Sequence, residues 1–423
     1  MRLSLFVLGL FFIPSLYAQV PDRVYAQNIN NVKLYLEGNS LAYPVWKVNS
    51  NNRMELHFDD MDPEVHNYSY TFQLYNADWT PANISPFDYL SGFSQQRITN
   101  YRFSSIAAVK YVHYQVTLPD RNCMPSRSGN YLLKVFADGD TSKLLFTRRV
   151  LVTEDLLPIA VLVQQPFNGQ YFRTHQKVQF TVNTSKLNLL NVIQQLNVCI
   201  LQNNRWDNYL HNIKPTFMRP GSLEFNTEQD AIFPAGREWR WLDLRSFRLQ
   251  SDRVDHADYS GNKTAIFVKP DVDRLQQRTV FYRDNNGQYY NEAIESINPL
   301  WQADYATVHF SFIPPGKIPL AGKDLYLFGE LTNYGDAPAA KMTYNEDKGV
   351  YETSLFLKQG YYDYCYVTVD QQASGFKASF DLTEGNSWDT ENNYTILVYY
   401  RSLSDRADRL IGLTSINSLT GRQ

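Results

Sequence analysis

The chain has 423 residues, of which 15% are aromatic, and its formal net charge is -3 at pH 7. Thirty tyrosines and twenty-five phenylalanines suit the half-buried faces of pleated sheets, so the composition favours an all-β protein. A nearly balanced charge gives no basic face for nucleic acid or for anionic lipid, and a chain of this length predicts about three domains.

The first eighteen residues predict a secretory signal peptide. Arg2 supplies a positive start, residues 3–13 form an apolar run, and residues 16–18 end in Ala18 before the predicted cut. The run is shorter than the ~20 residues of a membrane-spanning helix. Gln19 rather than a cysteine follows the cut, which argues against a lipid anchor. We therefore expect a mature protein free in solution beyond the inner membrane.

The next segment predicts a first β-sandwich over residues 19–155. Apolar and polar residues alternate at 54–58 and 68–74, and the loop at 59–63 predicts that these two strands are antiparallel neighbours. Asp59, Asp60, Asp62 and Glu64 are expected in a solvated turn, with a Ca²⁺ loop as the alternative. Further strands are predicted at 114–118, 130–137 and 143–152.

Two more sandwiches are predicted, at 156–300 and 301–423, after a junction marked by Glu154, Asp155 and Pro158. In the first of them, the turn at 284–287 predicts a hairpin between 280–282 and 289–290. The remaining predicted strands lie at 159–163, 178–182, 196–201, 223–225, 239–244, 308–312, 351–357, 361–369 and 395–400, with Tyr362, Tyr364 and Tyr366 on one face. An outer-membrane β-barrel is the alternative that alternating strands leave open.

Motifs for catalysis are missing from the sequence. It contains no G-x-S-x-G elbow, no H-E-x-x-H, no P-loop and no G-x-G-x-x-G. Its three cysteines are far apart, and its seven histidines show no metal-ligand spacing. We expect no enzyme activity, metal or cofactor, and a hydrolase with a scattered active site is the minor alternative.

The segment Phe233–Arg248 mixes tryptophan with arginine. Alternation places Trp239 and Trp241 on one face and Glu238, Arg240 and Leu242 on the other. Such a mixture is typical of the centres of protein interfaces. It is also compatible with tryptophans in a core and arginines paired across strands.

Six motifs occur in order at 56–60, 76–81, 88–93, 100–104, 111–114 and 128–135. Together they resemble the plug proteins of the type IX secretion system, and 233–248 and 406–415 are similar to that family too. The resemblance implies a periplasmic protein that seats against the periplasmic opening of a giant outer-membrane β-barrel translocon and blocks it at rest. It implies a monomer within that complex, peripheral to the outer membrane through its partner.

Candidate contact residues follow from the resemblance and from the Phe233–Arg248 segment. They are Trp79, Tyr89, Phe93, Trp239, Arg240 and Trp241. The C-terminal unit also resembles the immunoglobulin-like, early-set modules that bind starch or precede glycogen-active enzymes, through residues 329–334 and 362–364. That second resemblance makes a glycan-binding protein the alternative function, with Tyr334 where such modules usually carry a tryptophan platform.

Overall fold

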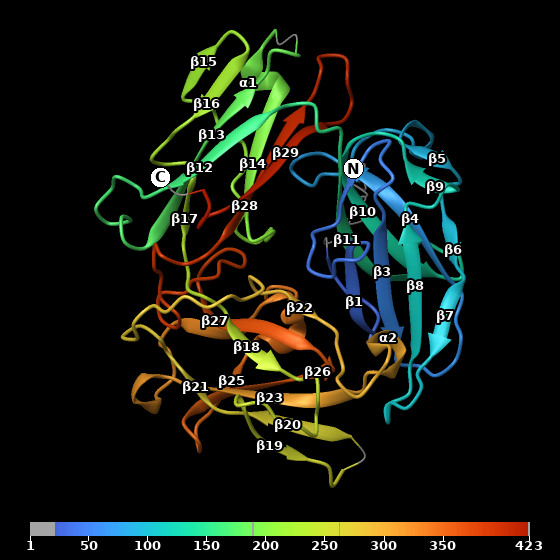
Figure 1. Ribbon diagram of the computed structural model, residues 1–423, viewed down its shortest axis with the longest axis vertical. Helices are drawn as coiled ribbons and strands as arrows, with labels where there is room; N and C mark the ends of the chain where they lie inside the picture. The colour runs from blue at the N-terminus through green and yellow to red at the C-terminus, as the bar shows by residue number, and fades with distance from the viewer. Residues whose placement is uncertain (1–21, 188–189, 262, 422–423) are drawn as a thin grey trace, which may run out of the picture.

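A computed structural model describes residues 22–187, 190–261 and 263–421, and the strands of these residues form three β-sandwiches (Figure 1). The first sandwich lies at the right of the view, the second at the upper left and the third at the bottom. The all-β prediction is confirmed, since the few helices are single turns. The predicted signal peptide, 1–18, lies outside the described residues.

The first sandwich has two antiparallel sheets that face each other. One has the order β1-β3-β8-β7, and the other runs β11-β10-β4-β6, with β2 parallel to β11. Its elements are β1 (Ile29–Leu36), β2 (Val45–Lys47), β3 (Met54–Asp60), β4 (Tyr68–Tyr75), η1 (Pro86–Asp88), β5 (Leu90–Gly92), β6 (Gln96–Ile98), β7 (Asn100–Phe103), β8 (Val112–Leu118), β9 (Cys123–Pro125), β10 (Gly129–Ala137) and β11 (Leu144–Thr153).

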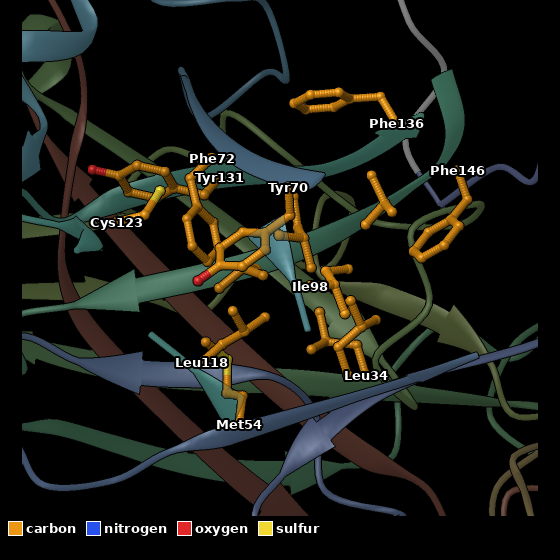
Figure 2. Packing of buried hydrophobic residues seen from close by; sticks show 14 of the residues in the cluster. Leu34, Met54, Tyr70, Phe72, Ile98, Leu118, Cys123, Tyr131, Phe136 and Phe146 are labelled. Carbon is orange, nitrogen blue, oxygen red and sulfur yellow. The ribbon is translucent and has the colours of Figure 1, made fainter. Parts of the chain in front are cut away.

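The core of the first sandwich is made by the inward-facing residue of each alternating pair. Met54 and Leu118 from one sheet lie against Tyr70 and Phe72 from the other (Figure 2). All four side chains are buried. Burying a large apolar side chain contributes about 1.5–3 kcal/mol, so this layer is the main source of stability for the first sandwich.

The expected pairing of the strands at 54–58 and 68–74 is wrong. β3 pairs with β1 and β8, whereas β4 pairs with β10 and β6 in the opposite sheet. The connection between them therefore crosses from one sheet to the other. Alternation cannot distinguish the two arrangements, because a strand in either sheet of a sandwich has one buried face.

The second sandwich includes strands from both ends of the chain that follows residue 155. β14 pairs with β28, and β28 pairs with β29. The other sheet contains β12, β13, β15, β16 and β17. The elements are β12 (Ile159–Gln164), β13 (His175–Asn183), α1 (Val192–Gln195), β14 (Leu196–Gln202), β15 (Phe217–Arg219), β16 (Ser222–Phe225), β17 (Ile232–Pro234), β28 (Asn393–Tyr400) and β29 (Arg409–Asn417).

The third sandwich lies between β17 and β28 in the sequence. One sheet has β27 paired with β18, β22 and β24, and the other has the order β19-β20-β23-β26-β25. The elements are β18 (Arg240–Asp243), β19 (Val254–Asp258), β20 (Thr264–Val268), β21 (Asp271–Val272), β22 (Tyr289–Tyr290), α2 (Pro299–Gln302), β23 (Tyr305–Ile313), η2 (Pro315–Lys317), β24 (Lys323–Phe328), η3 (Glu330–Thr332), η4 (Pro338–Ala340), β25 (Thr343–Asn345), β26 (Val350–Lys358) and β27 (Tyr361–Asp370).

Tyrosines on β27 fill the core of the third sandwich. Tyr362, Tyr364 and Tyr366 are buried together there, as their shared face predicts. The expected hairpin at 284–287 is wrong, because 280–282 is not a strand and β22 pairs with β27 instead. The chain does turn before β22, but the segments on either side of the turn do not pair with each other.

The strands of the second and third sandwiches are interleaved along the chain. β18 and β22 fall within 156–300 but pair with β27, whereas β28 and β29 fall within 301–423 but pair with β14. The sheets therefore group these strands differently from the predicted domain ranges. Turn residues mark where strands end, and they carry no information on which distant strand completes a sheet.

A shared sheet joins the first two sandwiches. β11 of the first pairs in parallel with β29 of the second, at Thr153 and Leu410. The Glu154 N–H donates to the Leu410 carbonyl at 3.0 Å, and the Arg409 guanidinium donates to Glu154 at 2.9 Å. The order β14-β28-β29-β11-β10-β4-β6 is therefore one continuous sheet across two cores.

Candidate functional site

Charged groups of the first and third sandwiches meet in the interior of the molecule. Asp59 on β3 and Lys358 on β26 form an ion pair of 2.6 Å, and neither side chain is exposed. The same carboxylate accepts a hydrogen bond from the Tyr305 hydroxyl at 2.5 Å. The Lys358 ammonium also donates to the main-chain carbonyl of Leu300 at 2.6 Å, and it lies 4.3 Å from the centre of the Tyr111 ring.

The carboxylates predicted in a solvated turn divide between interior and surface. β3 continues through Asp59 and Asp60, which are both fully buried, so the prediction is wrong for these two and holds for the exposed Glu64. Asp60 accepts hydrogen bonds from Tyr68 at 2.6 Å and Asn28 at 2.7 Å. Among residues 22–187, 190–261 and 263–421, no three His, Cys, Asp or Glu side chains are placed to hold a metal ion.

The charge state of the buried pair follows from its neighbours. Burial opposes ionisation of Asp59, but Lys358 and His113 outweigh it, so the pKa of this carboxyl lies below its usual range. Burial lowers the pKa of Lys358, and Asp59 partly offsets that effect. A buried pair of this kind stabilises the fold little compared with apolar packing, but removal of one partner leaves an uncompensated buried charge.

Lys358→Met should therefore lower the free energy of unfolding by about 3–5 kcal/mol, because Asp59 would remain buried without its cation. Urea denaturation measures this. The matched control is Lys348→Met, which removes an exposed ion pair to Glu352 of similar length, 2.7 Å, and should cost under about 1 kcal/mol. An equal decrease in the free energy of unfolding of both variants would contradict the role of Lys358 as the buried partner of Asp59.

Two histidines extend the buried network from Asp59 toward the outer side of the first sandwich. His113 Nδ1 lies 2.6 Å from Asp59 Oδ1, and His113 Nε2 lies 3.1 Å from His57 Nδ1. Because the ionised carboxylate only accepts, His113 donates to it and accepts from His57. His57 Nε2 is then an unprotonated acceptor, and it has no hydrogen-bond partner among the described residues; Glu55 is 3.7 Å away.

Burial, assisted by His113, lowers the pKa of His57 to about 3. As pH falls from about 6.5 through about 3, the unfolded chain takes up a proton here that the folded protein excludes, so stability is lost over that range. As pH falls, the free energy of unfolding of His57→Gln should decrease less steeply than that of the wild-type protein. The two slopes should differ by up to about 1.4 kcal/mol per pH unit. Denaturation between pH 4 and 7 tests this, and a wild-type slope in the variant would contradict it.

A cavity of about 580 Å³ opens beside this interface, and residues of all three sandwiches line it. Lys33 on β1 reaches across to Glu330 at 2.7 Å and to the Tyr289 carbonyl at 2.9 Å. The Trp206 indole donates to the Tyr43 hydroxyl at 2.6 Å. No local motif could predict this cavity, because its walls come from segments far apart in the chain.

The Trp/Arg segment at 233–248 runs from β17 of the second sandwich into β18 of the third, and its Trp239 and Arg240 are buried. The buried Arg240 guanidinium donates to Asp271 at 2.7 Å and to Glu384 at 2.9 Å. Burial opposes its charge, but Glu384 and Asp271 outweigh this and raise the pKa of Arg240. Trp239 is buried against Gly287, where a Cβ atom would lie 2.6 Å from the indole ring.

Three acidic side chains near Trp239 form no ion pair with a described residue; Glu238 and Asp363 are buried, and Asp284 is half-buried. Burial, with Asp284 as the next cause, raises the pKa of Glu238 and of Asp363 to about 8, and burial raises the pKa of Asp284 to about 6. Glu238 Oε2 and Asp363 Oδ1 have no hydrogen-bond partner among the described residues. These groups therefore favour the protonated state inside the fold.

Glu238→Gln should reduce the loss of stability that accompanies rising pH. Between about pH 4.5 and 8, the unfolded chain releases a proton that the folded Glu238 retains, so the free energy of unfolding falls as pH rises. The neutral amide removes this dependence. Thermal unfolding at pH 5 and pH 8 should show a smaller difference in Tm for the variant, and an equal or larger difference would contradict the assignment.

The six predicted contact residues do not form one surface. Tyr89, Trp239 and Arg240 are buried, and Trp241 is half-buried. Phe93 is 67% exposed. Half-buried Trp79 packs edge-on against Trp206, with ring centres 5.0 Å apart, and the Arg149 guanidinium lies 4.7 Å from the Trp79 ring.

Comparison with known proteins identifies the first sandwich. Residues 29–154 match the model of a family described as Type 9 secretion system plug protein 1st domain. Residues 29–154, which we call the plug domain, are therefore similar to the first domain of type 9 secretion plug proteins. This family supports a general role as a plug in type IX secretion, which suggests a structural rather than an enzymatic function and a place in the periplasm near the outer membrane.

A solved structure extends the likeness beyond the plug domain. The crystal structure of a hypothetical protein from Parabacteroides merdae has a TM-score of 0.90 and 28% identity, and the match covers 94% of this chain and 100% of that one. A score that high over so much of the chain requires a similar arrangement of the sandwiches that follow the plug domain. No curated protein matches the chain. No helix within the described residues is long and apolar enough to cross a membrane.

Proposed function

We propose that this protein is a periplasmic plug that binds the periplasmic opening of the outer-membrane translocon barrel of the type IX secretion system and occludes it at rest. The observation that carries the proposal is the match of residues 29–154 to the plug family. The contacts between the three sandwiches also support it, because a protein that blocks a pore needs a rigid structure.

Contacts between the sandwiches favour one stiff body. The first and second share a sheet through β11 and β29, and the first and third share the buried pair of Asp59 and Lys358. Arg205 of the second sandwich lies 4.8 Å from the ring of Phe328 in the third. Domains within one chain move relative to each other unless their interface is extensive, and these three are tied by buried polar contacts.

The plug domain also carries large apolar side chains that are mostly exposed. They are Phe87 (85% exposed), Phe93 (67%), Phe103 (56%) and Ile106 (72%). Exposed aromatic side chains of this kind are enriched at the centres of protein interfaces. We propose Phe93 as a contact to the barrel, because it is the most exposed of the six candidate contact residues.

The environment of Tyr334 gives little support to the alternative glycan-binding role. Tyr334 contacts Phe328 edge-on, with ring centres 5.6 Å apart. The Arg205 guanidinium lies 5.9 Å from the centre of the Tyr334 ring. A sugar-binding platform needs an aromatic ring with a free face. Phe328 and Arg205 lie around the Tyr334 ring and leave less room for a sugar.

Co-purification with the translocon barrel from detergent-solubilised outer membrane tests the proposal. The wild-type protein should be recovered with the barrel, and Phe93→Ser should reduce recovery by about 10-fold or more, as for a hot-spot truncation. The control is Phe217→Ser, which makes the same substitution at an exposed phenylalanine of the second sandwich (56% exposed). It should leave recovery unchanged. Failure of the wild-type protein to co-purify would refute the plug role, and equal recovery of both variants would refute the contact at Phe93.

A further inference from the structure

The cavity at the junction has its charges paired, with one exception. Its walls bring together β1, β11, η3 and the loops that carry Tyr43 and Trp206. Ion pairs at or next to the wall join Lys33 to Glu330, Arg149 to Asp22, Arg205 to Asp207 and Arg23 to Asp336. Each of these cations therefore has a carboxylate partner.

Arg148 is the exception. Its guanidinium donates to two main-chain carbonyls, those of Thr147 at 2.8 Å and Val32 at 3.1 Å, and it forms no ion pair with a described residue. A guanidinium has five N–H donors in a planar fork, so these two bonds leave donors for a ligand. Burial lowers the pKa of Arg148, and Asp22, Glu330 and Asp336 offset part of that effect, although each of these carboxylates is ion-paired with another cation.

Aromatic rings form much of the remaining wall. The cavity volume of about 580 Å³ lies within the range of about 300–1,000 Å³ found for small-ligand sites. The aromatic residues that line it are Tyr43, Trp206, Tyr289, Tyr334, Phe356, Tyr362 and Phe376. A ligand held here would present one acid group to Arg148 and an apolar or aromatic body to the rings.

We propose that this cavity is a binding site for a carboxylate ligand with an aromatic or aliphatic body, and that Arg148 binds the carboxylate. A guanidinium that has no ion-pair partner among the described residues favours an anion, and its planar fork suits a carboxylate with two parallel hydrogen bonds. The carboxylate could belong to a free organic acid or to the C-terminal end of a peptide. The site goes beyond the plug role and does not depend on it.

Isothermal titration of the full mature protein tests the site with three probes. Benzoate represents a free acid, the tripeptide Gly-Gly-Phe represents a chain end, and Gly-Gly-Phe amide lacks the carboxylate. Binding of benzoate alone would identify a small-acid site, whereas tighter binding of Gly-Gly-Phe would identify a chain-end site, and either result supports the proposal. The amide should bind at least 10-fold more weakly than the free tripeptide.

Arg148→Gln should weaken binding of the preferred acid at least 10-fold. The matched control is Arg121→Gln, which changes an exposed arginine on the first sandwich and should leave the affinity unchanged. Lack of binding by both acids, equal binding of the amide, or equal binding by Arg148→Gln would each overturn the proposal. The comparison of acid with amide uses the unaltered protein, so it decides the question even if Arg148→Gln does not fold.

Discussion

The ion pair between Asp59 and Lys358 is the constraint on which the arrangement of the molecule depends. Two charges can be removed from water only if their geometry and remaining hydrogen bonds are nearly complete. Tyr305, His113 and the Leu300 carbonyl supply those bonds, and they come from both sandwiches. The first and third sandwiches therefore fit together in one orientation, since sliding one past the other would leave both charges without partners.

The same orientation creates the cavity and sets its electrostatics. Lys33 and Arg148 project from the first sandwich, whereas Glu330 belongs to the third, so the wall charges match only when the two sandwiches are correctly placed. Apolar contact could tolerate a range of positions, because it is not directional. Buried polar contacts restrict that range, and we attribute the defined shape of the junction to them.

Sequence patterns predicted the fold class and most strands, but not which strands meet. Period-two alternation identified β3, β4, β13, β23 and β27, because each has one face in a core. It could not show that β3 and β4 belong to opposite sheets, or that β28 completes a sandwich begun at β12. Asp59 looked like part of a solvated turn, since its partner Lys358 lies 299 positions away in the chain. The motifs at 56–135 nevertheless pointed to the plug family, which the match at 29–154 bears out.

The interleaving of the second and third sandwiches determines the order in which the molecule can be built. Thr395 on β28 donates a hydrogen bond to Asn204, which follows β14, and the two residues are 191 positions apart. The plug domain can form from a continuous stretch of chain before the rest is complete, and domains generally fold from the N-terminus onward. The second sandwich cannot be completed until the whole third sandwich has been synthesised. Until then, the edge of β14 that pairs with β28 is unpaired. A chaperone or a protease would therefore meet the folding protein chiefly at that open sheet edge, before β28 and β29 pair with β14.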